Sequence, residues 1–286
     1  MMGRDILDRF YFRATVDWIA LEVRCKKATN AQTMRRRLGV PYVEALDFGP
    51  GGAAMHFRFR VQAPESWAEV VATVANIQNS INDVRVVGIE VAVDAYPVSL
   101  KDAWEMSEVA IYLRRGDCRP ASDNARFAGR MGSRGEVASA NTMNELESGF
   151  KKGKTLNVGD VSAPRSQRIY IKTTDEGGRP LNPKEHRVRF ENTMFAESFA
   201  ELGLPTDFNS WSAIDFGCLG TLFKFREMAE DSEKPLRAIL DRIPQLGQRR
   251  TRRRRVGGTR LYGRGTVASP LNEVIRGKLR DLSRRW

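Results

Sequence analysis

The first hundred residues alternate between apolar and polar positions in runs typical of β-strands. Residues 14–24 (ATVDWIALEVR) and 84–96 (VRVVGIEVAVDAY) carry β-branched and aromatic residues at alternating positions, so each predicts a long strand. Two more predicted strands, 41–49 and 53–62, flank the turn residues Pro50-Gly51-Gly52, and this arrangement predicts a hairpin.

Helices are predicted between these strands. A short helix is predicted over 30–38, with Thr29 or Asn30 as its N-cap and Gly39 at its end. Apolar residues with helical spacing predict a longer helix over 66–80, where Ser66 and Glu69 have the spacing of a capping box. A third helix is predicted to begin at Ser99. The resulting order, β-α-β-β-α-β, matches the split βαβ, ferredoxin-like plan.

Residues 114–154 interrupt the pattern. They are rich in Gly, Ser and Arg without an apolar period, and they predict an exposed basic loop. Three strand-like runs follow within 155–191, then helical segments near 196–203 and 210–230. We therefore predict an α/β (α+β) protein in which split βαβ, ferredoxin-like halves form a central, mostly antiparallel sheet within residues 1–247.

The C-terminal segment 248–286 differs sharply from the rest in charge. It holds thirteen Arg and Lys residues against Glu273 and Asp281, a net charge of +11 out of the +12 of the whole chain. A polycation of this kind favours a polyanionic partner, because each phosphate that it neutralises releases counterions. We expect DNA contacts from its arginines, namely Arg249, Arg250, Arg252, Arg253, Arg254 and Arg255.

The last residues of the chain predict an amphipathic helix. It begins at Ser269-Pro270 and places Leu271, Ile275 and Trp286 among the apolar residues of one face. The pattern is compatible with packing on the body of the protein, on a second protomer or beside DNA.

Composition limits the class of protein. No run of about 18 apolar residues exists, so no membrane span is expected. The N-terminal residues lack the apolar stretch of a signal peptide, and Cys25, Cys118 and Cys218 follow no zinc or disulfide pattern. We expect a cytoplasmic protein with reduced thiols.

Acidic residues inside the two long strands predict a metal site. Asp17 is expected to share a strand face with Ile19 and Leu21, and Glu90 and Asp94 share a face of the later strand. If the strands are neighbours, the carboxylates suit Mg or Mn, with Glu191 as a further ligand. The alternative is that they form salt bridges with Arg168, Arg187 or Lys172 across the sheet.

A tyrosine with flanking cations lies in the second half of the chain. Strand geometry places Arg168, Tyr170 and Lys172 on one face. Arg187 and Arg189 recur with the same alternation in the following strand, and we expect both to contact DNA. A phenol beside two cations can attack a phosphodiester as a nucleophile. The alternative is a structural tyrosine with surface cations.

The segment TLNVG…RIYIK…HRVRFE resembles the signature of the replication initiation factor (Rep_trans) family, the rolling-circle initiators of Gram-positive plasmids and filamentous phages. VDWIALEV and GIEVAVDAY are similar to two earlier strands of that family, in the same order. The resemblance covers about residues 14–195. It implies an enzyme that nicks one strand of an origin through a tyrosine, which maps onto Tyr170.

The resemblance also implies the cofactor and partners. A divalent metal would be held by carboxylates that map onto Asp17 and onto Glu90 or Asp94. The shared strand face, and not the resemblance, is the reason to expect phosphate contacts from Arg168 and Lys172. Origin DNA, both single-stranded and duplex, would be the substrate. A host helicase and a second protomer are the further partners that it implies.

This sequence departs from the family pattern at several positions, and the departure next to Tyr170 bears most on function. Ile171 stands where family members often carry an acidic residue, so either Glu191 or Asp175 replaces that ligand or cleavage is lost. The alternative function is therefore a non-catalytic DNA-binding protein of the same fold. An RNA-binding module is a third interpretation, which we disfavour because the strands lack the aromatic pairs of a base-stacking sheet.

Overall fold

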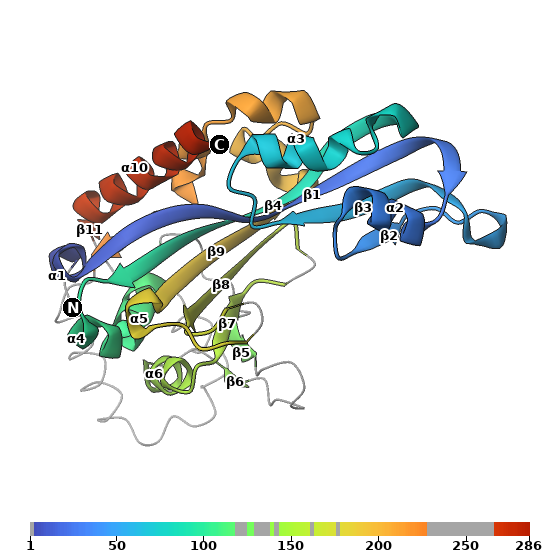
Figure 1. The fold of residues 1–286 in the computed structure, drawn as a ribbon. Coiled ribbons are helices and arrows are strands. Elements are labelled where there is room, and N and C mark those ends of the chain that lie inside the picture. The colour runs from blue at the N-terminus through green and yellow to red at the C-terminus, as the bar shows by residue number, and fades with distance from the viewer. Residues whose placement is uncertain are drawn as a thin grey trace, which may run out of the picture.

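A computed structural model describes residues 3–117, 125–128, 138–139, 143–160, 163–175, 178–227 and 266–286. Its centre is a nine-stranded sheet in the order β2-β3-β1-β4-β9-β8-β7-β5-β6, and every pair of neighbouring strands is antiparallel (Figure 1). This confirms the predicted α/β class with a central antiparallel sheet.

The first half of the sheet follows the ferredoxin-like plan. Its strands are β1 (Phe10–Thr29), β2 (Val43–Ala45), β3 (Ala54–Gln62) and β4 (Ile81–Pro97). Helix α2 (Ala31–Leu38) connects β1 to β2, and α3 (Trp67–Ala75) connects β3 to β4, so each βαβ unit encloses the strand of the other. The short helix α1 (Gly3–Arg9) precedes β1.

The second half has a different order. After α4 (Leu100–Trp104) and α5 (Met106–Gly116), the hairpin strands β5 (Ala125–Ala128) and β6 (Ala138–Ser139) lie at one edge. Helix α6 (Met143–Lys151) leads to a meander of β7 (Thr155–Val158), β8 (Arg165–Lys172) and β9 (Arg187–Phe195). This half therefore contains one split βαβ unit, formed by β6, α6 and β7 around β5, and not a repeat of the first half.

The predicted basic loop over 114–154 is only partly a loop. Its described residues include β5, β6 and α6, and Phe127, Leu146 and Phe150 are buried in the core. The rings of Phe127 and Phe150 pack edge to face at 5.2 Å. The apolar residues of this segment are few and widely spaced, so the sequence pattern did not reveal them.

Helix starts and ends show how local chemistry shaped these elements. Helix α2 begins at Asn30, whose side chain accepts from the Thr33 amide, and it ends at Gly39 in the left-handed conformation. The capping box predicted at Ser66 does not form, because Glu69 accepts from the Glu65 amide instead.

The capping box of α4 joins Ser99 to Asp102, and the helix stops at Glu105 before α5 begins. The region beyond β9 is mostly 3-10 turns. The predicted helix over 196–203 is present as the turn Ala196–Ser198 and helix α7 (Phe199–Leu202). The one predicted over 210–230 is instead two turns, Phe208–Ala213 and Phe216–Thr221, each opened by an aspartate that accepts from a backbone amide.

One face of the sheet carries the hydrophobic core. Ile19, Val91, Ile169 and Phe190 are fully buried there. Phe190 contacts the rings of Phe223 and Phe225, which belong to the region after β9. The opposite face of β1, β4, β9 and β8 holds the charged side chains.

The terminal helix α10 (Ser269–Arg285) packs on the body of the protein (Figure 1). Leu271, Ile275 and Leu279 are buried against β1 and the turn Phe216–Thr221. The carbonyl of Trp286 accepts from the Trp67 amide at 2.8 Å. Of the three placements compatible with the sequence, the structure therefore shows the first. The predicted boundary at residue 247 lies outside the described residues.

No helix among the described residues is both long enough and apolar enough to cross a lipid bilayer.

Candidate functional site

A β-bulge determines the position of Asp17. Val16 pairs with Val91 and Trp18 pairs with Glu90, so Asp17 is an extra residue without a partner in β4. Its carboxylate lies on the charged face, whereas Ile19 and Leu21 are in the core. The expectation that Asp17 shares their face was wrong, because the bulge shifts the alternation by one residue.

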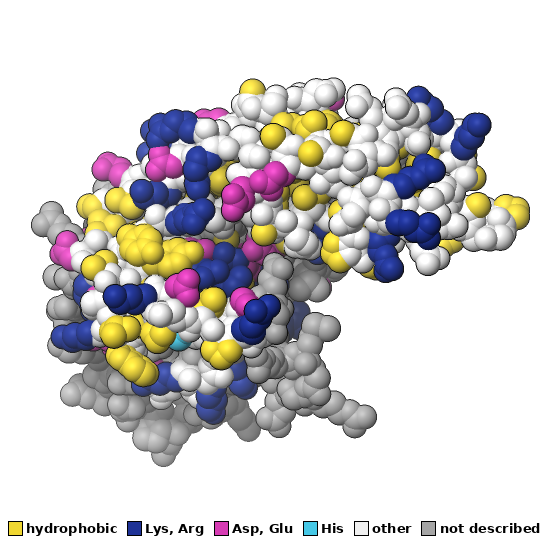
Figure 2. Space-filling model, viewed as in Figure 1, with side chains coloured by type: hydrophobic (Ala, Val, Ile, Leu, Met, Phe, Trp, Pro, Cys, Tyr) yellow, Lys and Arg dark blue, Asp and Glu magenta, His cyan; other side chains and the backbone are white. Residues whose placement is uncertain are grey.

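Cross-strand pairing arranges the charged side chains in rows across β1, β4, β9 and β8. One row runs from Arg13 through Asp94 and Arg189 to Tyr170. The next row runs from Thr15 through Ala92 and Glu191 to Arg168. Basic and acidic side chains gather in this way in the hollow of the molecule that faces the viewer in Figure 2.

Tyr170 is anchored to the carboxylates of the neighbouring strand. Its hydroxyl donates to Oε1 of Glu191 at 2.7 Å. Arg168 joins the same group, because its Nε lies 2.8 Å from Oε2 of Glu191 and its Nη2 donates to Oε1 of Glu90 at 2.7 Å. Thr193 donates to the other oxygen of Glu90. The predicted nucleophile and two predicted carboxylates therefore lie together.

Asp94 belongs to a neighbouring ion-pair cluster, which Arg189 joins to Asp17. Both of its oxygens accept from Arg189, at 2.7 and 2.8 Å, and Arg187 approaches it at 3.3 Å. Arg189 also donates to Asp17 at 2.6 Å, so its guanidinium bridges two strands. The salt-bridge alternative is thus realised for the fully buried Asp94. It is realised also for Asp17, which pairs with Arg189, and for Glu90 and Glu191, which pair with Arg168.

Three carboxylates are arranged so that one cation can reach them. Single oxygens of Asp17, Glu90 and Glu191 all lie within 4.8 Å of one another. Oxygen ligands of this kind fit a hard divalent ion such as Mg or Mn. Asp94, predicted as a ligand, is not in this group.

Burial shifts the proton affinities of the site. It raises the pKa of Glu90, and it raises the pKa of Glu191 to about 7, even though Arg168 opposes both shifts. The pKa of Tyr170 is raised by burial and by the charge of Glu191, so the phenol is protonated at neutral pH. Burial and the two nearby arginines lower the pKa of Lys172.

The geometry clarifies the role of position 171. Ile171 packs against the core on the face opposite Tyr170. An acidic side chain at this position of β8 would therefore point away from the carboxylate group. Glu191 lies within that group, whereas Asp175 accepts from the amide of Arg179 in a turn beyond β8.

One polar partner, Thr193, and one aromatic pair escaped the sequence analysis. Thr193 extends the alternation of Arg189 and Glu191 by one step, and that spacing was the available signal. Tyr11 and Tyr96 form a stacked pair across β1 and β4, contrary to the expectation that the strands carry no aromatic pair. Residues so distant in the chain become neighbours only through strand register.

The predicted DNA contacts of Arg187 and Arg189 stay predictions. Both guanidiniums are directed toward Asp94, and the side chain of Arg189 is only 6% exposed. The tail arginines Arg249–Arg255 lie outside the described residues.

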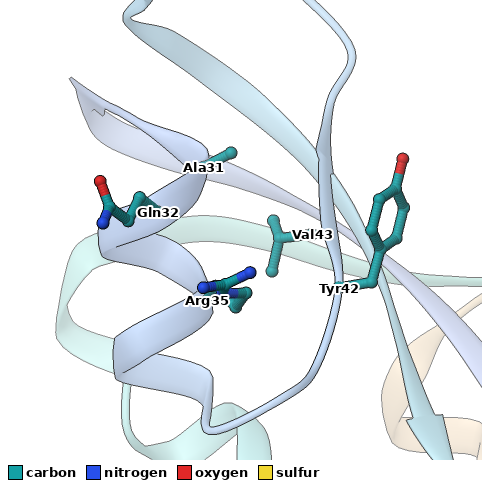
Figure 3. Close-up of a pocket in the computed structure, with 5 residues that line it drawn as sticks. All are labelled: Ala31, Gln32, Arg35, Tyr42 and Val43. Carbon is teal, nitrogen blue, oxygen red and sulfur yellow. The ribbon is translucent and has the colours of Figure 1, made fainter.

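A pocket of about 320 Å³ lies away from this site, between α2 and the edge strand β2 (Figure 3). Its lining includes Gln32, Arg35 and Tyr42 and contains no acidic residue. It does not contribute to the carboxylate group.

No protein-family model matches the chain, and no curated protein matches it. Among solved structures, the rolling circle replication initiator protein from Geobacillus stearothermophilus aligns over 77% of this chain and 89% of its own. The sequences are 16% identical and the TM-score is 0.37. An agreement at this level assigns neither a family nor a function to the chain.

Proposed function

We propose that this protein initiates rolling-circle DNA replication by nicking one strand of an origin, with Tyr170 as the nucleophile. The observation that supports it is the 2.7 Å hydrogen bond from Tyr170 to Glu191, one of the three carboxylates within reach of a single cation. The resemblance of residues 14–195 to rolling-circle initiators points to the same chemistry.

The reaction transfers a phosphoryl group to the protein. The Tyr170 oxygen forms a bond to the scissile phosphorus while the bond from phosphorus to the 3′ oxygen breaks. Glu191 is positioned to accept the phenol proton, and the departing 3′ oxygen takes up a proton to become a hydroxyl. The product is a 5′-phosphotyrosine ester, which keeps the bond energy needed for rejoining.

Asp17, Glu90 and Glu191 would hold the divalent metal, Mg or Mn. When bound, the ion would polarise the scissile phosphate and offset its developing charge. Asp94 would act through Arg189 and not as a metal ligand. It accepts hydrogen bonds from Arg189, and Arg189 in turn donates to Asp17. Asp94 and Arg189 are thus positioning residues.

Arg168 and Lys172 are the side chains that would contact the phosphate. The side chain of Arg168 is 40% exposed although it pairs with Glu90 and Glu191, and Lys172 flanks Tyr170 on the other side. Both can contact a phosphodiester held against the phenol. The arginine tail over 248–265 would add contacts to origin duplex. A helicase and a second protomer are partners by resemblance alone.

The second candidate is a non-catalytic DNA-binding protein. One observation favours it. The basic side chains Arg168, Arg187 and Arg189 already compensate the buried carboxylates of the site without any metal. A site of this kind is stable as an ion-pair network and would tolerate the loss of catalysis.

Nicking of supercoiled DNA separates the two candidates. The full chain is incubated with Mn and a supercoiled plasmid that carries the DNA flanking its own gene, and the products are analysed on a denaturing gel. A nick with protein attached to the 5′ end, present in wild type and in Tyr42→Phe but absent in Tyr170→Phe, is the expected result.

One outcome would contradict the assignment of Tyr170, and another would contradict a catalytic function. Equal nicking by Tyr170→Phe would exclude this nucleophile. A tight complex without any nick, insensitive to EDTA, would favour the non-catalytic protein. Tighter binding to RNA than to DNA of matched sequence would support an RNA-binding module instead.

A further inference from the structure

Two tyrosines stack on the charged face beside the site. Tyr11 of β1 and Tyr96 of β4 are cross-strand partners, with ring centroids 5.0 Å apart and planes inclined by 8°. The guanidinium of Arg187, from β9, lies 5.4 Å from the ring of Tyr96. Since β4 lies between β1 and β9 in the sheet, Tyr96 is enclosed on both sides and held in place.

The outer side of Tyr11 is free of a neighbouring strand. Within the described residues, β3 pairs with β1 only from Trp18 onward, so no strand lies beside Tyr11 at this edge. The side chain of Tyr11 is 54% exposed, unusually high for an aromatic ring in a long strand. It presents a ring whose orientation is already set by Tyr96.

The stack adjoins the row that contains Tyr170. Tyr11 is two residues from Arg13, whose row ends at Tyr170, and rows along a strand are separated by about 7 Å. Three strand spacings of about 4.8 Å place Tyr11 about 15 Å across the sheet from Tyr170. A strand bound at Tyr170 can therefore extend to Tyr11.

Positive charge accompanies the stack. Arg187 and Lys172 are cross-strand partners that continue this row, and Arg13 is exposed in the adjacent row. Aromatic faces beside cations are the arrangement that binds bases and phosphates of a single strand. Duplex DNA offers no free base face to such a ring.

We propose that Tyr11, backed by Tyr96, is a base-stacking subsite for single-stranded DNA that flanks the scissile phosphate. The inference rests on the proposed DNA substrate, but it concerns binding and not cleavage. Its occupant is an unpaired nucleobase, with Arg13, Arg187 and Lys172 beside its backbone.

The test measures binding in a protein that lacks the nucleophile. Full-length Tyr170→Phe, alone and combined with Tyr11→Ala, Tyr11→Trp or Tyr42→Ala, is titrated against labelled oligo(dT), and anisotropy is recorded. Tyr11→Ala should weaken binding roughly 10-fold, within the range of a lost base–aromatic stack. Tyr11→Trp should retain it. Tyr42→Ala is the matched control, since Tyr42 is 64% exposed but immediately precedes edge strand β2.

An oligomer of abasic deoxyribose phosphate of equal length identifies the contact. It keeps every phosphate and lacks every base, so Tyr11→Ala should leave its binding unchanged. An equal loss for both oligomers would overturn the inference, as would unaltered oligo(dT) binding by Tyr11→Ala. A loss confined to oligo(rU) would overturn it in favour of RNA.

The readout separates the two proposals. Tyr11-dependent binding without nicking activity would leave the subsite standing and refute the nuclease. Nicking by a protein whose oligo(dT) binding does not depend on Tyr11 would support the nuclease and refute the subsite.

Discussion

The hydroxyl of Tyr170 and the carboxylate of Glu191 are joined by a hydrogen bond of 2.7 Å between adjacent strands. The two residues are diagonal neighbours, because Tyr170 pairs with Arg189 and Glu191 pairs with Arg168. The same carboxylate contacts Arg168 and lies in the group with Asp17 and Glu90. Glu191 is therefore the residue through which the phenol, a cation and the candidate metal ligands are connected.

Glu191→Gln should lower the rate of nicking by about 100-fold or more, because the amide neither accepts the phenol proton nor supplies a charged ligand. DNA binding should remain. Glu201→Gln is the comparison, since Glu201 is exposed and pairs with Arg165 on the surface. Rates from single-turnover nicking assays decide the matter, and equal rates for both variants would remove Glu191 from the chemistry.

Asp17→Asn should weaken Mn²⁺ binding by at least roughly tenfold, because even indirect partners of a metal contribute that much to affinity. Isothermal titration of the full chain with Mn²⁺ measures it without reference to activity. Asp175→Asn provides the control, since Asp175 lies outside the carboxylate group. If Asp175→Asn proved the more damaging change, the ligand set would need revision.

Arg189→Met should destabilise the fold by about 3–5 kcal/mol, because it leaves the fully buried carboxylate of Asp94 without its main partner. Combining it with Asp94→Asn should recover part of that loss. Urea unfolding of the two proteins gives the comparison. A single variant as stable as wild type would show that the pair has no structural role.

Asp102→Asn should reduce stability at neutral pH by about 1 kcal/mol, the usual contribution of a helix cap. Hydrogen bonds from Ser99 and then from Arg9 lower the pKa of Asp102 in the folded protein. Because the pKa of Asp102 is lower in the folded protein, ionised Asp102 stabilises the fold at pH values above its pKa in the unfolded chain, which is about 4. This stabilisation is lost as the pH falls through the pKa of Asp102 in the folded protein.

The difference between wild type and Asp102→Asn should therefore shrink in acid. Thermal unfolding of both proteins between neutral pH and about pH 3 measures this difference in stability, because that range includes the usual pKa of a carboxyl group. A difference that grew toward low pH would contradict the assignment.

Leu279→Ala should cost about 2–5 kcal/mol, because Leu279 is fully buried where the terminal helix meets the body. Lys278→Ala, one position away and 41% exposed, should change stability by less than about 0.5 kcal/mol. Denaturant unfolding of both variants measures the contribution of α10. Equal stability would mean that the helix is not part of the core.

The periodic spacing of apolar residues predicted much of the fold. The alternation in β1 and β4 and the helical spacing of α2 and α3 are local signals, since each depends on a side chain and its near neighbours along the chain. The same alternation placed Arg168, Tyr170 and Lys172 on one face, as the register of β8 with β9 shows. The amphipathic pattern of the terminal helix likewise identified its apolar face.

Elements with few apolar residues were harder to predict. Helix α6 and strand β5 lie in a segment whose composition favours a loop, and only burial against the sheet explains why Phe127 and Phe150 order it. The two 3-10 turns after α7 have helical apolar spacing, but Asp207 and Asp215 cap short turns there instead of one long helix.

The sequence by itself determined the faces of β4 and β8, the first split βαβ half and the list of charged and phenolic candidates, because these follow from residue types and spacings along the chain. Tertiary structure alone decided which of them meet. The bulge at Asp17 turned that carboxylate to the charged face, and strand register joined Glu191 to Tyr170 and Tyr11 to Tyr96. Such contacts depend on how strands far apart in the chain align, and a shift of one residue would move every one of these side chains to the other face.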